Sequence, residues 1–142
     1  MSAPASTAPR GIRNNNPGNI RWGDAWQGLI DPSQRTDPSF CQFTEPVYGI
    51  RAMARIFAKY SDAYGLTTVR GIIGRWAPPS ENNTDAYVQN VANLIGVGPD
   101  DKINVHDTRT MDTLIKAVIQ HENGQQPYDT ATIDKGVALA GV

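Results

Sequence analysis

The stretch Met111-Asp-Thr-Leu-Ile-Lys-Ala-Val-Ile-Gln-His-Glu-Asn-Gly124 carries the clearest helical pattern of the chain. Its apolar side chains recur at the spacing of one helix face: Met111, Leu114, Ile115 and Val118. At 100° per residue, Glu122 lies about 20° from Ile115 and about 40° from Val118 around the axis. Its carboxyl group therefore continues the apolar side of the helix, in the last turn before Gly124.

Two physical effects act on a carboxyl group at this place. Partial burial disfavours its ionised form, and so do the free carbonyl groups at the negative end of the helix. A carboxyl group that stays protonated near neutral pH is what a general acid requires. The alternative is a frayed last turn, in which the Glu122 carboxylate is in water beside His121 or Lys116.

The chain has only two other glutamates, and their surroundings differ from that of Glu122. Glu45 precedes Pro46 at a predicted helix start, where the positive end of the helix dipole stabilises a negative charge. Glu81 lies in the polar loop Pro79-Ser-Glu-Asn-Asn83, where a solvated side chain or an acid beside a cleft are both open. Glu122 is therefore the leading candidate for acid chemistry.

The composition excludes several classes of protein. The 142 residues carry 13 Lys and Arg against 14 Asp and Glu, so the net charge of −1 gives no basic field for nucleic acid. One cysteine, Cys41, excludes an internal disulfide, and two histidines without an H-E-x-x-H motif argue against a zinc protease. We expect neither a metal nor a cofactor.

The pattern of turns and apolar residues predicts one domain. Residues 1–9 are small, Pro-rich and polar and are expected to form a flexible lead-in, followed by a single domain over 10–142. Short extended pieces at 19–22, 26–30 and 40–43 predict a small, irregular antiparallel sheet. Four to five helices are expected after residue 45, so the predicted class is α+β and mainly helical. No signal peptide and no membrane span are recognisable.

Several motifs resemble those of the lysozyme-like peptidoglycan hydrolases. His121-Glu-Asn-Gly124 resembles the catalytic Glu-Ser/Asn-Gly signature of lytic transglycosylases and bacterial glucosaminidases. Asn15-Asn-Pro-Gly-Asn-Ile-Arg21 is similar to their cleft strand, and Thr84-Asp-Ala-Tyr-Val88 to the helix start whose tyrosine lies near the catalytic Glu. The resemblance implies a lysozyme-like fold with Glu122 and Tyr87 as catalytic residues. The motifs stand in a different order, which implies a circular permutation.

A second resemblance covers nearly the whole chain, from Arg10 to Tyr128. Arg10-Gly-Ile-Arg-Asn-Asn-Asn-Pro-Gly-Asn-Ile20, together with Arg75-Trp-Ala-Pro-Pro79, resembles small phage endolysins and virion-associated lysins. Members of that group cut either the glycan or the peptide part of the wall. The resemblance implies a bacteriolytic protein of the virion or of the host cytoplasm, which acts at the cell wall.

Six residues are candidates for binding the substrate. Asn15, Asn16 and Asn19 could present amides to acetamido and hydroxyl groups of a sugar, although asparagine also serves in turns. Arg13 and Arg21 could meet peptide carboxylates or form surface salt bridges. Trp22 could stack on a sugar ring or pack within the sheet.

These observations predict a peptidoglycan hydrolase that cleaves between MurNAc and GlcNAc. The reaction is of the lytic transglycosylase or the lysozyme type. No aspartate stands out as a second catalytic carboxylate, and the resemblance then implies a lytic transglycosylase, in which one glutamate acts first as acid and then as base. The alternatives are a murein endopeptidase and a non-catalytic virion structural or cell-wall-binding protein. We expect a monomer whose partners are peptidoglycan and either phage particle proteins or an immunity protein. Nucleic acid is not an expected partner.

Overall fold

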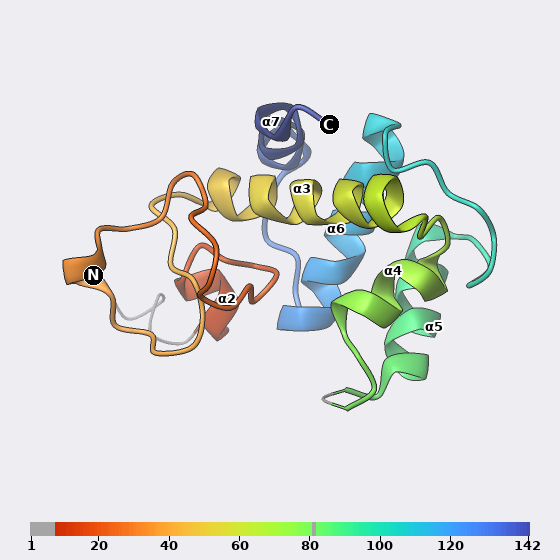
Figure 1. Cartoon of the computed structure of the whole chain (residues 1–142), viewed down its shortest axis with the longest axis horizontal. Helices are drawn as coiled ribbons and strands as arrows, with labels where there is room; N and C mark the ends of the chain where they lie inside the picture. Colours follow the sequence, from red (N-terminus) through yellow and green to blue (C-terminus); the bar gives the residue numbers. More distant parts are fainter. Residues whose placement is uncertain (1–7, 81) are drawn as a thin grey trace.

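The computed structural model describes residues 8–80 and 82–142 (Figure 1). Most of the predicted N-terminal lead-in, residues 1–7, and Glu81 lie outside the described residues. Within them the chain forms six α-helices and one short 3-10 helix: α2 (Arg10–Arg13), η1 (Pro32–Gln34), α3 (Pro46–Tyr64), α4 (Val69–Trp76), α5 (Thr84–Ile95), α6 (Thr108–Asn123) and α7 (Thr130–Ala140).

Local side-chain hydrogen bonds fix where most of the long helices begin. Thr68, Asn83, Asp107 and Asp129 stand just before α4, α5, α6 and α7, and each side chain accepts a hydrogen bond from a backbone N–H of the first turn. Helix α3 begins differently, with Glu45 in extended conformation and Pro46 as its first residue. Helix α6 ends where Gly124 turns the chain with a φ of 71°, so Glu122 stays in the last helical turn.

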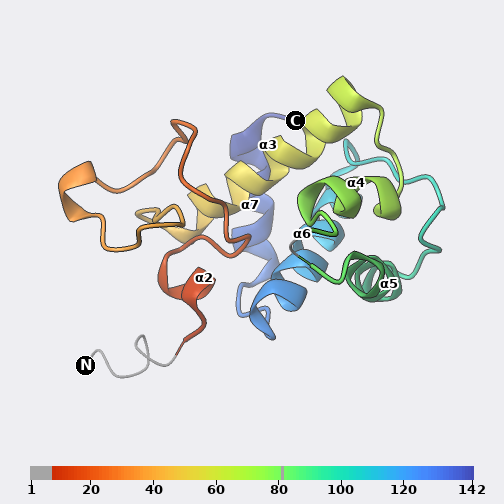
Figure 2. The ribbon, with the colours of Figure 1, turned by 60° about the horizontal axis from the view of Figure 1, so that its bottom comes forward.

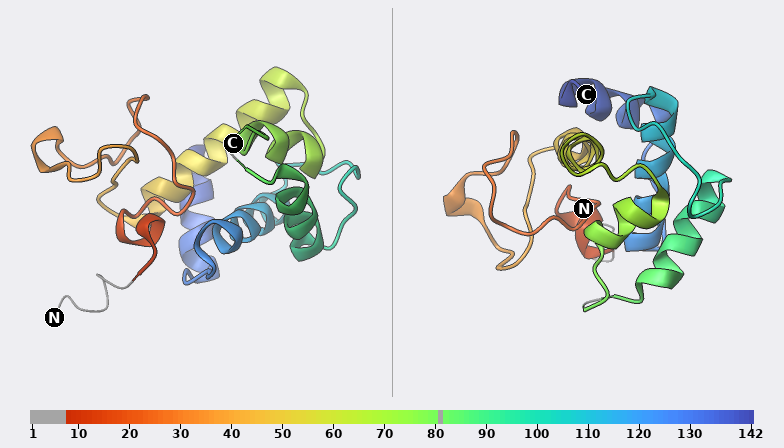
Figure 3. Two further views of the ribbon diagram at one scale, coloured as in Figure 1. Left: turned by 90° about the horizontal axis from the view of Figure 1, so that it is seen from below. Right: turned by 45° about the vertical axis from the view of Figure 1, so that its right-hand side comes forward.

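The helices enclose one large apolar core. Helix α7 crosses over α3, and α3 also contacts α4 and α6, while α5 packs on α6 and α4 (Figure 1 and Figure 3, right). Fully buried side chains from all of these helices meet there, including Phe57, Ile72, Val91, Ile115 and Ile133. The predicted apolar face of α6 is part of this core, since Met111, Leu114, Ile115 and Val118 are 0% exposed.

The predicted antiparallel sheet is wrong, and with it the α+β class and the sheet of the lysozyme-like fold. No strand occurs in the described residues; the pairing is reduced to isolated bridges, Arg21 with Phe40 and Leu29 with Phe43 in the predicted region. Residues 14–45 instead form long loops beside the helices, preceded by the unpredicted helix α2 and interrupted by η1 (Figure 2). The expected extended pieces come close together but do not continue as ladders.

In this loop region, residues 10–45, buried polar side chains provide hydrogen bonds that strand pairing would provide in a sheet. The Asp37 carboxylate accepts hydrogen bonds from Nε and Nη2 of Arg10 and from Nδ2 of Asn14. It also accepts hydrogen bonds from the backbone N–H groups of Ser39 and Phe40. A smaller apolar cluster of Cys41, Phe43 and Ala52 joins this region to α3. Buried backbone N–H and C=O groups need hydrogen-bond partners, and a loop has no neighbouring strand to provide them. In this region side chains are those partners.

None of the helices in residues 8–80 and 82–142 combines the length and the apolar sequence that a membrane-spanning segment needs.

Candidate active site

Glu122 is half-buried in the last turn of α6, and each of its carboxyl oxygens accepts one hydrogen bond. Tyr87 Oη of α5 donates to Oε2 at 2.7 Å, and Asn19 Nδ2 of the loop region donates to Oε1 at 3.0 Å. The donors stand 35 and 103 residues away in the sequence. The tertiary structure thus fixes the carboxyl group from both sides, as preorganised catalytic groups require.

Tyr87 is held in place by a second donor and by burial. Its side chain is 2% exposed, and Trp76 Nε1 of α4 donates to its hydroxyl oxygen at 3.1 Å. Burial raises the pKa of Tyr87 far above its usual value, and the neighbouring Glu122 charge raises it further. Tyr87 therefore stays neutral over the physiological pH range, so its O–H remains a donor to Glu122.

Asn19 reaches Glu122 because the loop that carries it is tightly built. Its backbone has a φ of 51°, a left-handed conformation that asparagine tolerates better than most residues. Nearby, Asn123 Nδ2 donates to the backbone oxygen of Pro17 at 2.8 Å and ties the end of α6 to the same loop. A Cβ on Gly11 would lie 2.7 Å from Asn123 Oδ1 and 2.8 Å from Asn19 Oδ1. Only glycine leaves this arrangement undisturbed.

His121 lies beside the pair formed by Tyr87 and Glu122. Its ring stacks on Tyr87, with the ring centroids 3.6 Å apart, and its Nδ1 is 2.8 Å from Asn90 Nδ2. Burial lowers the pKa of His121. The imidazole is therefore neutral near pH 7 and supports Tyr87 by packing.

Glu122 lines a cavity of about 490 Å³ between the loop region and the helices. Its walls are formed by residues 18–21, by Tyr60 of α3 and by residues 75–78 at the end of α4. Two basic side chains, Arg21 and Arg75, line it, and among the described residues Glu122 is its one carboxylate. A cavity of this size suits one or two sugar rings, and it combines a positioned acid, aromatic surface and positive charge.

The predicted binding residues separate into two groups. Asn19 and Arg21 line the cavity with Glu122. Asn16 does not, because it is fully buried and bonded internally: Nδ2 donates to the backbone oxygens of Ile20 and Cys41, and Oδ1 accepts from Ile20 N. Asn15 has a φ of 53° and donates to the backbone oxygen of Phe43. These two asparagines hold the loops together, so we leave them out of the proposed binding set.

Two further predicted binding residues also lie outside the cavity. Arg13 is exposed at the end of α2 and does not line it. Trp22 donates its indole N–H to the backbone oxygen of Asp37 at 2.7 Å, and the Arg35 guanidinium stacks over its ring at 3.8 Å. Trp22 therefore packs within the loop region, and Arg35 covers its ring.

Other cavity residues were not singled out by the sequence. Trp76 lines the cavity at the end of α4, where it is half-buried and donates a hydrogen bond to Tyr87. Tyr60, Arg75 and Asn82 also line the cavity, and no local pattern sets them apart. In the part of the chain that the structure describes, no three His, Cys, Asp or Glu side chains come together as a metal site would need.

Comparison with known proteins relates the chain to bacteriophages. No protein-family model matches it. Over 133 residues, 91% of this chain, it is 44% identical to Protein P5 of Pseudoalteromonas phage PM2, and the match covers 80% of the phage protein. The chain therefore belongs to the family of phage PM2 Protein P5.

Proposed function

We propose that this phage-family protein cleaves the glycan strand of peptidoglycan between MurNAc and GlcNAc, with Glu122 as the acid. The observation that carries the proposal is the fixing of the Glu122 carboxyl group, by Tyr87 and Asn19, at a cavity that fits sugar rings. Both neighbours donate hydrogen bonds, and each carboxyl oxygen has a second lone-pair position that can face the substrate.

The proposed reaction needs one carboxyl group in two roles. Glu122 protonates the glycosidic oxygen, the bond between C1 and that oxygen breaks, and the electron pair of the bond stays on the leaving sugar. The carboxylate then accepts a proton from the nucleophile that attacks C1. If this is the C6 hydroxyl of the same MurNAc, the product is a 1,6-anhydro sugar; if it is water, a reducing end forms.

Tyr87 and Asn19 act in this scheme as positioning residues. Tyr87 keeps its O–H toward Oε2, and Asn19 keeps its amide toward Oε1, so the carboxyl group cannot rotate freely. Arg21 and Arg75 line the same cavity and would hold anionic groups of the polymer. Because the chain belongs to a family with a phage protein, the proposed action at the bacterial wall could take place from the virion or from inside the infected cell.

The test is Glu122→Gln assayed on purified sacculi. Because the amide cannot donate a proton to the glycosidic oxygen, we expect release of soluble fragments to fall by at least about 100-fold. Glu45→Gln is the matched control, since it makes the same change at the exposed start of α3, outside the cavity. Circular dichroism of both variants checks that the helices are retained.

Mass spectrometry of the released fragments identifies the bond that is cut. New 1,6-anhydro-muramic acid supports the transglycosylase route, and new reducing ends support hydrolysis. New amino groups would mean that an endopeptidase cuts the cross-linking peptide, which contradicts the proposal. Binding to sacculi without release of fragments by the wild-type protein would also contradict it, in favour of a non-catalytic wall-binding protein. Full activity of Glu122→Gln would remove Glu122 from the mechanism.

A further inference from the structure

A second and larger cavity, of about 980 Å³, lies along α3 beside the one that holds Glu122. Ile56, Tyr60 and Arg75 line both cavities. The two cavities therefore share a wall and lie next to each other.

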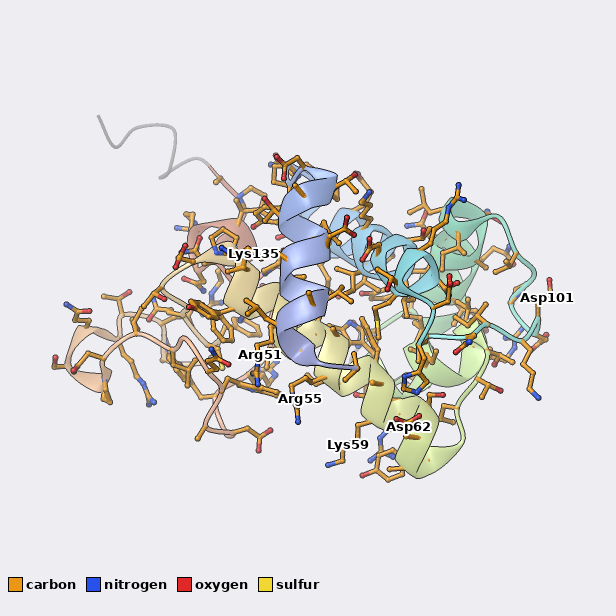
Figure 4. All side chains as sticks on the ribbon, turned by 90° about the horizontal axis from the view of Figure 1, so that it is seen from above. Arg51, Arg55, Lys59, Asp62, Asp101 and Lys135 are labelled. Atoms are coloured by element: carbon orange, nitrogen blue, oxygen red, sulfur yellow. The ribbon has the colours of Figure 1, made fainter. Side chains whose placement is uncertain are left out.

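Four basic side chains line this second cavity and form what we call the basic row: Arg51, Arg55, Lys59 and Arg75. The first three recur every fourth residue on one side of α3, as Figure 4 shows. Two aspartates, Asp24 and Asp62, also line the cavity, which leaves an excess of two positive charges among its described side chains. No residue of the basic row forms an ion pair with a carboxylate in the described part of the chain.

The basic row keeps hydrogen-bond donors available. Arg51 Nε donates to the backbone oxygen of Leu139 at 3.3 Å, and Arg55 Nη1 to that of Ala140 at 2.9 Å. Each guanidinium has five N–H donors, so most of them stay free for a ligand. Lys59 is exposed and makes no hydrogen bond among the described residues, and the Arg75 guanidinium is steadied over the Tyr64 ring at 3.8 Å.

We propose that the basic row binds the carboxylates of the peptide branch of peptidoglycan while the glycan strand lies at Glu122. This inference rests on the proposed function and names the part of the substrate that the second cavity recognises. From Arg51 to Lys59 the helix rises about 12 Å, at 1.5 Å per residue. An extended peptide of four residues spans about 13 Å, so the row matches the length of such a branch.

Other anionic partners fit this surface less well. Nucleic acid and acidic membranes are bound by broad basic surfaces, whereas this chain has a net charge of −1. The basic row lies in a concave cavity next to the candidate active site, which suits a short flexible chain. The peptide branch is also joined covalently to the sugar that the proposed reaction involves, so both parts of the substrate reach their cavities together.

The test compares binding of two soluble probes to the whole chain. One is a GlcNAc-MurNAc disaccharide that carries a tetrapeptide, and the other is the same disaccharide without the peptide. The glycosidic bond of each probe starts at C1 of GlcNAc, whereas the proposed reaction breaks the bond at C1 of MurNAc. Affinity is therefore measured without cleavage. We expect the wild-type protein to bind the peptide-bearing probe at least tenfold more tightly. Amidation of the peptide carboxylates should abolish that preference.

Lys59→Glu and Lys135→Glu form the matched pair of variants. Lys135 is an exposed lysine of α7 that lines neither cavity (Figure 4). Lys59→Glu should weaken binding of the peptide-bearing probe about fivefold and leave the peptide-free probe unchanged, and Lys135→Glu should change neither. Lys59→Gln should give a smaller loss in the same direction.

Equal wild-type affinity for the two probes would overturn the inference, and so would equal effects of the two charge reversals. A Lys59→Glu defect seen only with duplex DNA or anionic vesicles would assign the basic row to another polyanion and also overturn it. Selective peptide binding without cleavage of sacculi would retain the inference and contradict the proposed function. Cleavage of sacculi without selectivity for the peptide would support the proposed function and overturn the inference.

Discussion

The loop region of residues 10–45 and the helical region of residues 46–140 are stabilised in different ways. In the helical region, apolar side chains from five helices share one core, and the backbone satisfies its own hydrogen bonds. In the loop region, buried Asn14, Asn16 and Asp37 provide partners for backbone and side-chain groups. In this chain, side-chain hydrogen bonds therefore satisfy backbone groups of the irregular segment that strand pairing would otherwise satisfy.

Two buried aspartates show the contrast electrostatically. In the loop region, hydrogen bonds from Arg10 hold the pKa of Asp37 far below its usual value. In the helical region, burial and the neighbouring Asp134 raise the pKa of Asp112 on α6 to about 7. One carboxylate is bound as an anion, whereas the other is destabilised as an anion. Glu122 lies at the junction, with one donor from each region.

Asp37→Ala should have the largest effect on stability and should act on the loop region. Loss of the carboxylate leaves Arg10, Asn14 and two backbone N–H groups without their acceptor, and we expect a cost of about 3 kcal/mol. Urea unfolding gives the total, and amide hydrogen exchange shows whether residues 10–45 open first. Asp24→Ala is the control, since Asp24 is exposed and accepts no hydrogen bond among the described residues.

The pH dependence of this region follows from the lowered pKa of Asp37. A carboxyl group whose folded-state pKa is lowered contributes stability above its unfolded pKa, near 4, and loses it as the pH falls below that. Wild-type stability should therefore fall in acid, and Asp37→Ala should lose less of its remaining stability over the same range. Parallel acid profiles for the two proteins would contradict the role given to Asp37.

The same substitution, glycine to alanine, should act in opposite directions in the two regions. Gly11→Ala places a Cβ within 3 Å of Asn19 Oδ1, Asn123 Oδ1 and the backbone oxygen of Asn16, and should destabilise by about 2 kcal/mol. Gly74 lies inside α4 with nothing within 4 Å of an added Cβ, so Gly74→Ala should stabilise by about 0.5–1 kcal/mol. Thermal unfolding measures both changes, and equal signs would refute the contrast.

Gly11→Ala should also lower the proposed activity on sacculi, because it displaces the Asn19 amide from Glu122. Gly74→Ala should leave activity unchanged, since Gly74 lines neither cavity. A stable Gly11→Ala protein with full activity would show that Asn19 does not position Glu122.

Asp112→Asn should have a small effect and should stabilise the helical region. The amide keeps the shape of the side chain and removes the charge that faces Asp134, so we expect a gain of about 1 kcal/mol at pH 8. Because the folded-state pKa of Asp112 is raised, the folded wild-type protein favours the protonated carboxyl group. Its free energy of unfolding therefore falls as the pH rises from about 4 through 7 and Asp112 ionises. The gain should shrink toward pH 5. An exposed Asp24→Asn control should show no such trend, and a gain independent of pH would contradict the explanation.

The helices and the leading acid were predictable because their signals are local. The period of apolar residues and the capping residues place α3 to α7, and Glu122 does lie at the end of α6 beside the core. The loop region was not predictable in the same way. Alternating residues and turns suggested strands, but the hydrogen bonds of Asn16 and Asp37 compete with strand pairing, and no periodic pattern reveals them.

The period of the helices, their ends and the small number of glutamates, which directs attention to Glu122, can be read from the order of the amino acids. The folded chain was needed to show which donors reach that carboxyl group, that Asn16 is structural while Asn19 faces Glu122, and that α3 lines a second cavity with basic side chains. These two sets of features depend on interactions of different range along the chain. Backbone periodicity and capping act within about four residues, whereas the contacts to Glu122 join positions 35 and 103 residues apart and exist only once the core has formed.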